Sequence, residues 1–169
     1  MILAKDALLS AIKKGEIKIS PFNNDQVGTG SINLSLGNEF RVFYRHHCAI
    51  PVREEADFKK ITRAIKRDSY VLKPGELVLG ITKENVKLAD DLCGWIQGRS
   101  RFARLGLVIH ITAAFIQPGV NNKTVLEIYN AGPCDLELIP GERLCQLIVE
   151  RTDGKGRYKG KYKSQVGLR

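Results

Sequence analysis

The sequence of 169 residues lacks several features that mark whole classes of protein. It contains no run of about 18 apolar, uncharged residues, which a membrane-spanning helix would need. The N-terminal segment carries charges on a helical period in place of the apolar block of a signal peptide. Aromatic residues make up only 7% of the chain, with one tryptophan, so extended stacking platforms for nucleic acid are not expected. We therefore expect a cytoplasmic protein without a membrane partner.

Cysteine is also scarce, and its spacing argues against common metal and redox motifs. The chain has four cysteines: Cys48, Cys93, Cys134 and Cys145. None lies two to four residues from another, so neither a zinc ribbon nor a thioredoxin pair is present. We expect all four to be small buried packing residues. His46 and His47 would point apart in a polar loop, and His110, in an apolar run, is interpreted as a satisfied core histidine.

The length and composition indicate one domain with a basic tail. A hydrophobic content of 43% in 169 residues is enough to bury a core. The net charge is +9, and residues 151–169 contain seven Lys or Arg but only one Asp. Such a segment attracts phosphate, on a nucleic acid or on a small nucleotide. We expect residues 1–169 to form a single domain in which 151–169 is a tail that stays mobile until something binds it.

The hydrophobic pattern predicts a mainly β fold. Residues 4–14 place Ala4, Leu8 and Ala11 on one stripe of a short helix that ends near Gly15. Eight short apolar runs bounded by Gly, Pro, Asn and Asp then predict strands, at 31–36, 40–44, 77–81, 93–96, 107–115, 124–129, 134–139 and 144–149. Because no long helices separate them, we expect a sandwich or a distorted β-barrel with few other helical turns.

Two further segments interrupt this rhythm of strands. Residues 56–68 are rich in basic side chains and are interpreted as a surface helix or a basic insertion. Residues 100–105 have helical propensity but are followed by Gly106, which predicts a single helical turn between two strands.

Glu127 is the first candidate for chemistry. In a strand over 124–129 it would share one face with Val125 and Tyr129, while Leu126 and Ile128 would lie on the other. Burial of a carboxyl group raises its pKa towards the range in which it can accept and return a proton near neutrality. An equally good interpretation is a glutamate paired with a buried arginine for structural reasons.

The second candidate is the turn at residues 98–106, which carries three arginines and a serine. Ser100 and Arg104 are four residues apart, and Arg101 and Arg104 are three apart, so each pair shares a face of a helical turn. Backbone amides, a hydroxyl and guanidinium groups together suit a phosphate chain. A cationic surface turn without a ligand remains the alternative.

Taken together, five strings in order resemble the dCTP deaminases of the deaminase/dUTPase superfamily. The strings are GSINLSLGNEFRVF (30–43), PGELVLGITKENVKLADDLCGWIQGRS (74–100), GRSRFARLGLVIHITAAFIQPG (98–119), VLEIYN (125–130) and PGERLCQLIVE (140–150), with KYKSQ (161–165) near the C-terminus. The resemblance covers nearly the whole chain. It implies a dUTPase-like distorted barrel (a β-clip) that assembles as a homotrimer, with intersubunit sites and a tail that folds over the nucleotide.

The resemblance also implies roles for single residues. Glu127 falls on the glutamate that activates water for attack on C4 of dCTP, which yields dUTP and ammonia. Ser100 and Arg104 fall on the motif that holds water, base and phosphates, and Ala113 on a residue whose carbonyl helps to position the water. The expected nucleotide-binding residues are Arg99, Arg101, Thr112, Gln117, Gln146, Tyr158, Lys161, Tyr162 and Gln165. Mg²⁺ is expected to accompany the triphosphate.

Zinc is not expected in this chemistry. Zinc-dependent nucleobase deaminases carry an H-x-E element and a P-C-x-x-C element that supply a metal-bound hydroxide. Neither string occurs in this chain. Deamination would therefore rely on a tuned carboxylate and surrounding donors, with Glu127 in the place where the carboxylate is needed.

Three departures from the family pattern bear on the product. Asn33 stands where the family usually has Asp in S-V-D-L, and Gln117 stands where it has Asp in I-D-P-G. In dUTPases the latter Asp activates the water that attacks the α-phosphate, and an amide cannot accept that proton. We therefore expect weak or absent dUTP hydrolysis. Arg101, where a second Ser is common, adds a cation near the phosphates.

Two alternatives to a dCTP deaminase remain. One is a dUTPase or a bifunctional enzyme, which would release dUMP. The other is a basic β protein that binds single-stranded nucleic acid, or senses a nucleotide without turning it over, since Tyr158 and Tyr162 alternate with lysines in the tail. A nucleic-acid partner is the less expected of these. The pattern does not decide whether dUTP or dTTP also binds.

Overall fold

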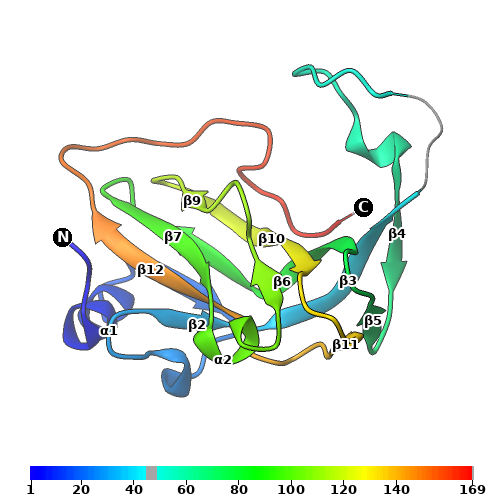
Figure 1. Cartoon of the computed structure of the whole chain (residues 1–169). Coiled ribbons are helices and arrows are strands. Elements are labelled where there is room, and N and C mark those ends of the chain that lie inside the picture. The colour runs from blue at the N-terminus through cyan, green and yellow to red at the C-terminus, as the bar shows by residue number, and fades with distance from the viewer. Residues whose placement is uncertain (45–48, 169) are drawn as a thin grey trace.

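The computed structural model describes residues 1–44 and 49–168, and within them the protein is mainly β, as predicted (Figure 1). The helical elements are α1 (Lys5–Lys13) and α2 (Ser100–Ala103), with single 3-10 turns η1 (Asn24–Gln26) and η2 (Phe58–Lys60). The strands are β1 (Ile17–Ser20), β2 (Ile32–Leu34), β3 (Leu36–Phe43), β4 (Thr62–Lys66), β5 (Tyr70–Leu72), β6 (Leu77–Leu88), β7 (Leu92–Gly98), β8 (Leu107–Ile109), β9 (Phe115–Ile116), β10 (Asn121–Asn130), β11 (Leu136–Leu138) and β12 (Cys145–Arg151). His46, His47 and Cys48 lie outside the described residues.

The described strands form two larger antiparallel sheets and a small one. The first sheet has the order β4-β3-β6-β10-β8, and β1 also pairs with β6. The second has the order β2-β12-β7-β9, and β11 pairs with β5 alone. The long strand β6 is the centre of the first sheet because it pairs with β3, β10 and β1 along its length.

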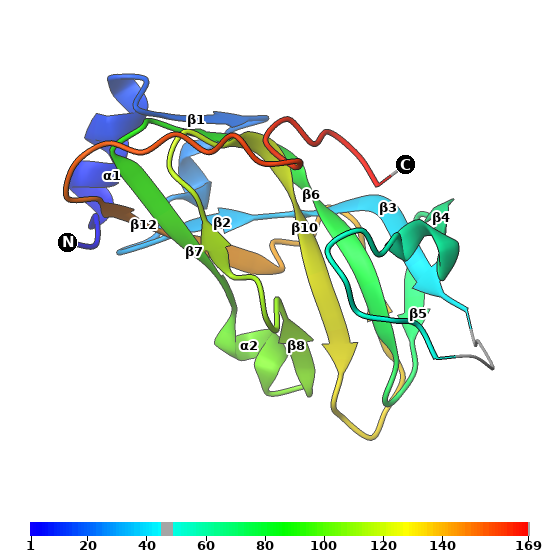
Figure 2. The ribbon, with the colours of Figure 1, turned by 90° about the horizontal axis from the view of Figure 1, so that it is seen from above.

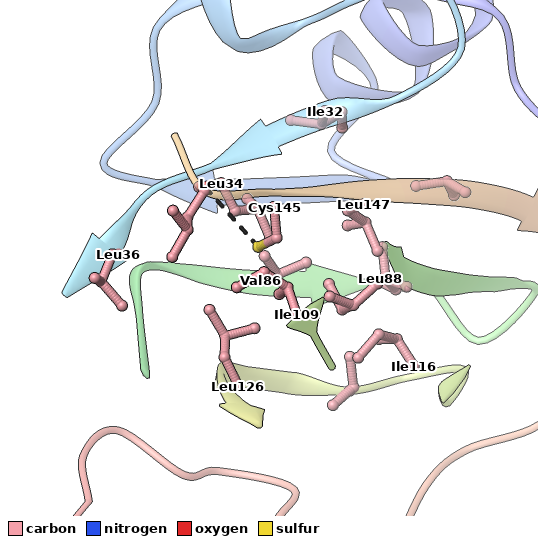
Figure 3. Close-up of a cluster of buried hydrophobic side chains, with 14 of the residues drawn as sticks. Ile32, Leu34, Leu36, Val86, Leu88, Ile109, Ile116, Leu126, Cys145 and Leu147 are labelled. Atoms are coloured by element: carbon pink, nitrogen blue, oxygen red, sulfur yellow. Dashed lines mark hydrogen bonds between the residues drawn. The ribbon is translucent and has the colours of Figure 1, made fainter. Parts of the chain in front are cut away.

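The hydrophobic core lies where the two larger sheets meet (Figure 3). Both sheets contribute fully or nearly fully buried side chains: Ile32, Leu34, Leu36, Val86, Leu88, Ile109, Ile116, Leu126, Cys145 and Leu147. Complete burial of a Leu or Ile side chain contributes about 1.5–3 kcal/mol relative to exposure. This contact therefore stabilises both sheets and fixes the orientation of β10.

The predictions for the helices and cysteines have mixed outcomes. The N-terminal helix is confirmed, with Leu8 and Ala11 buried and Gly15 at a φ of 75° just beyond its end. The single turn at α2 is also confirmed. Cys93 and Cys145 are buried packing residues as expected, but the prediction is wrong for Cys134, which is exposed in the turn before β11.

The segment 56–68 is neither a helix nor a simple insertion. It forms η2 and then β4, which pairs with β3 as an edge strand. Thr62 is buried, whereas Arg63 and Lys66 are exposed on this edge. Charged side chains on an edge strand discourage pairing with another chain. The basic residues that suggested a helix are therefore explained by the edge position of β4.

Strand boundaries differ from the prediction where the backbone bends. The run 107–115 is two strands, because the chain leaves β8 at His110, whose φ of 61° is incompatible with a strand, and re-enters a sheet at β9. The run 31–36 is likewise divided between β2 and β3. The strands β1 and β5 were missed because their few apolar residues lie beside polar ones, and β6 extends to Leu88.

Candidate active site

Glu127 lies on β10 with the alternation predicted from the sequence. Leu126 and Ile128 are fully buried, whereas Val125 and Glu127 are half-buried on the opposite face. The register of β10 against β6 shifts between Lys123 and Val125, which marks a bulge just before this stretch. A bulge re-aims the side chains that follow it, so it sets the direction of Glu127.

Among the described residues, the Glu127 carboxylate is held by Thr112 and not by the arginine that the structural alternative required. The Thr112 backbone N–H donates to Oε2 at 2.8 Å, and the Thr112 hydroxyl donates to Oε1 at 2.8 Å. The backbone is fixed as well, since the His110 N–H donates to the Glu127 carbonyl at 2.7 Å. Thr112 is itself exposed. The carboxylate is thus oriented at an open face of the sheet and is not enclosed within the core.

The segment between β8 and β9 carries His110 and Ala113 beside this carboxylate. His110 Nε2 lies 2.8 Å from the Ala113 carbonyl oxygen, while His110 Nδ1 is buried without a hydrogen-bond partner among the described residues. The interpretation of His110 as a satisfied core histidine is therefore wrong: the residue is half-buried and shapes the loop that carries Ala113. The expected carbonyl of Ala113 is engaged by this ring.

A pocket of about 290 Å³ opens next to this loop. Its walls come from residues 110–117, from β10 and from the tail. Five residues predicted from the sequence line it together: Ala113, Gln117, Tyr158, Tyr162 and Gln165. Thr124 and Val125 complete the wall on β10, and Val125 is two residues from Glu127 on the same face. The structure thus brings the 110–117 loop and the tail of one chain to the face that presents Glu127.

The basic turn lies at a second hollow, of about 570 Å³. Arg99, Ser100 and Gln146 line it, with α2 on one side and the ends of β7 and β12 on the other. Gln146 accepts a hydrogen bond from the Ser31 hydroxyl at 2.8 Å and donates to the Gly98 carbonyl at 3.2 Å. Three predicted residues, Arg99, Ser100 and Gln146, are therefore gathered where β7 ends and β12 begins.

The positive charges of the arginines near this hollow favour the binding of an anion. Arg99 Nη1 donates to the Arg143 carbonyl at 2.6 Å. Partial burial, together with the like charges of Arg101 and Arg143, lowers the pKa of Arg99, although it remains a cation. Arg101 and Arg104 are exposed. An arriving anion would relieve the repulsion among these guanidinium groups.

Among the described residues, the two hollows have no lining residue in common. Within one chain, Ser100 therefore belongs to one hollow, and Ala113 and Gln117 to the other. Lys161 lies in the tail beside a third hollow, together with Tyr162 and Gln165. Four other predicted residues line none of these three hollows: Arg101, Arg104, Thr112 and Glu127. The predicted residues therefore do not converge on a single cavity of one chain.

The tail follows the sheet edge and is not detached from it (Figures 1 and 2). The Tyr158 N–H donates to the Pro118 carbonyl at 2.9 Å, and the Lys123 N–H on β10 donates to the Gln165 carbonyl at 2.8 Å. Beyond β12, residues 152–168 form no helix or strand. Its mobility before a ligand binds stays a prediction.

Sequence reasoning missed several residues of the first hollow. Asn122, Lys123 and Phe115 line it beside the predicted residues. The Asn122 side-chain amide also donates to the Tyr162 carbonyl at 2.8 Å. Polar residues at the start of a strand are a weak signal, and only the path of the tail reveals that Asn122 and Lys123 face the tail.

Asn33, which departs from the family pattern, lies on β2, outside this hollow. Its side-chain amide donates to the Gln26 carbonyl at 3.2 Å.

No helix within the described parts of the chain is long and apolar enough to cross a membrane. No group of three or more His, Cys, Asp or Glu side chains among residues 1–44 and 49–168 is arranged to hold a metal ion.

The chain is similar to proteins of one family. Residues 2–152 match the family model described as dCTP deaminase-like. The chain is 37% identical to the dCTP deaminase of Marinomonas sp. (strain MWYL1), over 98% of this chain and 94% of the relative. It is 35% identical to a protein of Streptomyces coelicolor named dCTP deaminase, dUMP-forming, over 99% of this chain and 92% of the relative.

A solved structure shares the fold. The 2'-deoxycytidine 5'-triphosphate deaminase of Agrobacterium tumefaciens superposes with a TM-score of 0.70 at 21% identity, over 89% of this chain. This chain spans about half the length of that protein, 48%. With the family model matched over residues 2–152, the chain belongs to the dCTP deaminase-like family.

Proposed function

We propose that this protein catalyses the hydrolytic deamination of dCTP. The observation that carries the proposal is the Glu127 carboxylate, oriented by two hydrogen-bond donors of Thr112 at the open face of β10. Glu127 does not itself line the neighbouring pocket, whose walls include Ala113, which follows Thr112, and Val125, two residues before Glu127 on the same face of β10. Relatives with 37% and 35% identity carry the name dCTP deaminase, which supports the same substrate.

In this reaction Glu127 would act as general base and then as general acid. It would accept a proton from the water that attacks C4 of the cytosine ring and pass it to N3. It would then move the proton of the new C4 hydroxyl to the amino group, so that the C4–N bond breaks, ammonia leaves and the C4 carbonyl forms. The Ser100 hydroxyl and the Ala113 carbonyl would orient the water. Arg104 and Arg99 would bind the phosphates. Tyr158, Tyr162 and Gln165 would contact the nucleotide from the tail.

We infer that dUTP is the product that accumulates. Gln117 lines the pocket where the family pattern has an aspartate, and an amide cannot serve as the base for attack on the α-phosphate. The alternative is release of dUMP, which is favoured by the name of the Streptomyces coelicolor relative. Chromatography of reactions started separately with dCTP and with dUTP distinguishes the two, since dUMP formed from dUTP would overturn our inference.

The Glu127→Gln variant tests the deaminase proposal. It retains the shape of the side chain but cannot shuttle a proton, so kcat for ammonia release from dCTP should fall by about 10²- to 10⁴-fold. Glu137→Gln is the matched control, because Glu137 is an exposed glutamate on the two-stranded sheet of β11 and β5. An unchanged rate in Glu127→Gln, or no ammonia from the unaltered protein, would refute the proposal.

We also propose that the protein is a homotrimer with shared active sites. The separation of Ser100 from Ala113 and Gln117 into two hollows supports this, because a second copy can bring α2 of one chain to β10 of another. Trp95 and Phe115, 40% and 38% exposed with ring centroids 5.0 Å apart, offer an apolar surface next to β9. Apolar surface of this kind favours association.

Complementation between two inactive variants tests the shared site. Glu127→Gln and Arg104→Ala should each be nearly inactive alone. After the two are mixed and allowed to exchange subunits, hybrid trimers would contain sites with both residues intact, and activity should return. Light scattering measures the mass of the assembly. A monomeric mass, or no recovery after verified exchange, would contradict the proposal.

Metal use and location complete the proposal. We expect Mg²⁺ to be bound through the substrate's triphosphate, so that EDTA lowers the rate and added Mg²⁺ restores it. We expect the attack on C4 to need no zinc, so that a zinc-selective chelator used in the presence of Mg²⁺ leaves the rate unchanged. Cell fractionation would test the expected cytoplasmic location.

A further inference from the structure

The last described residue of the tail is packed differently from those before it. Leu168 is 3% exposed, whereas Tyr162 and Val166 are 44% and 71% exposed. A leucine buried at the end of a segment without regular structure does not contribute to a strand or helix of its own. Its burial must therefore hold the segment against the body of the protein.

Two side chains of β3 hold the Leu168 backbone. The Leu168 N–H donates to Glu39 Oε2 at 3.0 Å, and Arg41 Nη1 donates to the Leu168 carbonyl at 2.5 Å. Arg41 is 5% exposed. Its Nε donates to the Thr62 hydroxyl at 2.8 Å, and its guanidinium lies 5.2 Å from the centre of the Phe58 ring.

These contacts orient Arg41 independently of the tail. The guanidinium is fixed by β4 and by η2, so one of its donors is already directed at the position that Leu168 occupies. A buried cation with a fixed fork geometry loses little freedom when it binds a carbonyl group. The Leu168 carbonyl is thus bound by a guanidinium whose other donors contact Thr62.

The tail just before Leu168 pairs with the free edge of β10. The Asn121 N–H donates to the Lys163 carbonyl at 3.3 Å, and the Lys123 N–H donates to the Gln165 carbonyl at 2.8 Å. At this end of β10 the strand β8 is absent, since β8 pairs only with Ile128–Asn130 among the described residues. The tail therefore occupies the sheet edge, and Tyr162 and Gln165 reach the candidate pocket from there.

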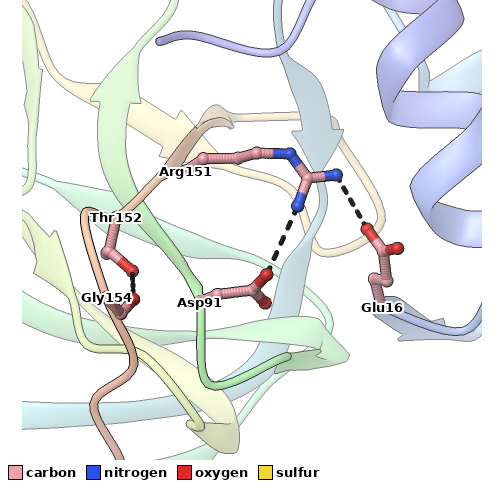
Figure 4. A network of polar contacts seen from close by, with 5 residues as sticks. All are labelled: Glu16, Asp91, Arg151, Thr152 and Gly154. Carbon is pink, nitrogen blue, oxygen red and sulfur yellow. Dashed lines mark hydrogen bonds and ion pairs between the residues drawn. The ribbon is translucent and has the colours of Figure 1, made fainter.

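The other end of the tail is fastened by exposed contacts. Arg151 forms ion pairs with Glu16 at 3.0 Å and Asp91 at 3.5 Å, where the chain leaves β12 (Figure 4). Arg157 pairs with Asp90 at 2.8 Å. Exposed pairs of this kind stabilise weakly. The buried contact at Leu168 is accordingly the stronger anchor, and Figure 2 shows that the tail crosses the molecule between these two fastenings.

We propose that Glu39 and Arg41 are positioning residues that bind Leu168 and thereby hold Tyr162 and Gln165 at the candidate pocket before the nucleotide arrives. Only Val166 and Gly167 separate Gln165 from Leu168, so the anchor restricts the register of the tail along β10. If the tail were docked in only a small fraction of molecules, the apparent affinity for the nucleotide would fall by that fraction. A tail that is docked in advance avoids this loss of affinity.

Amide exchange at Asn121 and Lys123 reports tail docking without any substrate. Both N–H groups donate to the tail, so they exchange when it leaves. In the full chain, Leu168→Ala should accelerate their exchange by about 10- to 100-fold, from the apolar area lost. Val166→Ala is the matched control and should leave exchange unchanged. Equal exchange in the two variants, or unprotected amides in the unaltered protein, would overturn the proposal.

Two variants of Glu39 distinguish loss of the Leu168 contact from a general loss of protein stability. Glu39→Gln retains an oxygen that can accept the Leu168 N–H, so protection of the Lys123 amide should persist, whereas Glu39→Ala should lose it. The functional consequence depends on the proposed deaminase activity: Leu168→Ala should raise KM for dCTP several-fold while kcat changes less. If no activity is found, the exchange experiment still decides the anchor. Faster exchange with an unchanged KM would overturn its role at the pocket.

Discussion

The close approach of Gly106 to Gly132 allows a stringent test of how the turn beside Ser100 is built. Gly106 has a φ of 87°, and a Cβ at this position would lie 2.5 Å from both the N and the Cα of Gly132. These are backbone atoms, which cannot rotate aside. The Gly106 carbonyl also accepts the Ala131 N–H at 2.9 Å, so the two segments are tied together at this point.

The expected loss of stability in Gly106→Ala has two parts. A left-handed conformation costs a non-glycine residue about 1–2 kcal/mol. Separating the two backbones to admit a methyl group costs a further 1–3 kcal/mol or so, by comparison with overpacked cores. The second part alone should lower Tm by about 2–12 °C for a domain of this size.

Two other glycines isolate these contributions. Gly141 has a φ of 94° but open space around its Cβ position, so Gly141→Ala should show only the conformational cost. Gly30 has no positive φ, and no described atom lies within 4 Å of its Cβ position, so Gly30→Ala should be close to neutral. Urea unfolding of the three variants at one protein concentration measures the series. If Gly106→Ala is no less stable than Gly141→Ala, the close backbone contact does not exist and the reasoning fails.

Two more predictions concern the bulge and the thiols. The hydroxyl of Thr82, which is fully buried, accepts a hydrogen bond from the Thr124 N–H at 2.9 Å at the bulge. Thr82→Val removes this acceptor, so it should lower the free energy of unfolding by about 1–3 kcal/mol and lower deaminase kcat through Glu127. Thr82→Ser retains the hydroxyl and is the control, and equal unfolding curves for the two variants would contradict this prediction. Burial raises the pKa of Cys145 to about 12, so its thiol stays protonated and unreactive at pH 8. After iodoacetamide treatment of the folded protein, peptide mapping should find alkylation at exposed Cys134 but none at Cys145. Modification of both cysteines would contradict the packing.

Much of the candidate site was predictable because it depends on local pattern. The alternation around Glu127 follows from the period of a strand, and the structure confirms that Leu126 and Ile128 face the core. The turn at 100–105 is confirmed because Gly106 ends it locally. The mainly β class and the family follow from many short apolar runs and from five strings in order.

Other features could not be read from local pattern, because they depend on contacts between distant segments. The partner of Glu127 is Thr112, fifteen residues away, and it reaches the carboxylate only because His110 turns the chain out of β8. The pattern at 56–68 suggested a helix, and only pairing with β3 decided for a strand.

The sequence by itself determined which residues have the chemistry for a nucleotide: a carboxylate in an apolar strand, a turn rich in arginine and a basic tail. Tertiary structure alone decided which of them meet. It joined the tail to the 110–117 loop and β10, placed Ser100 at another hollow, and directed a buried Arg41 at Leu168 across 127 positions of sequence. The physical reason is that side-chain chemistry is a property of each residue, whereas proximity arises from how the sheets pair and pack around a shared core.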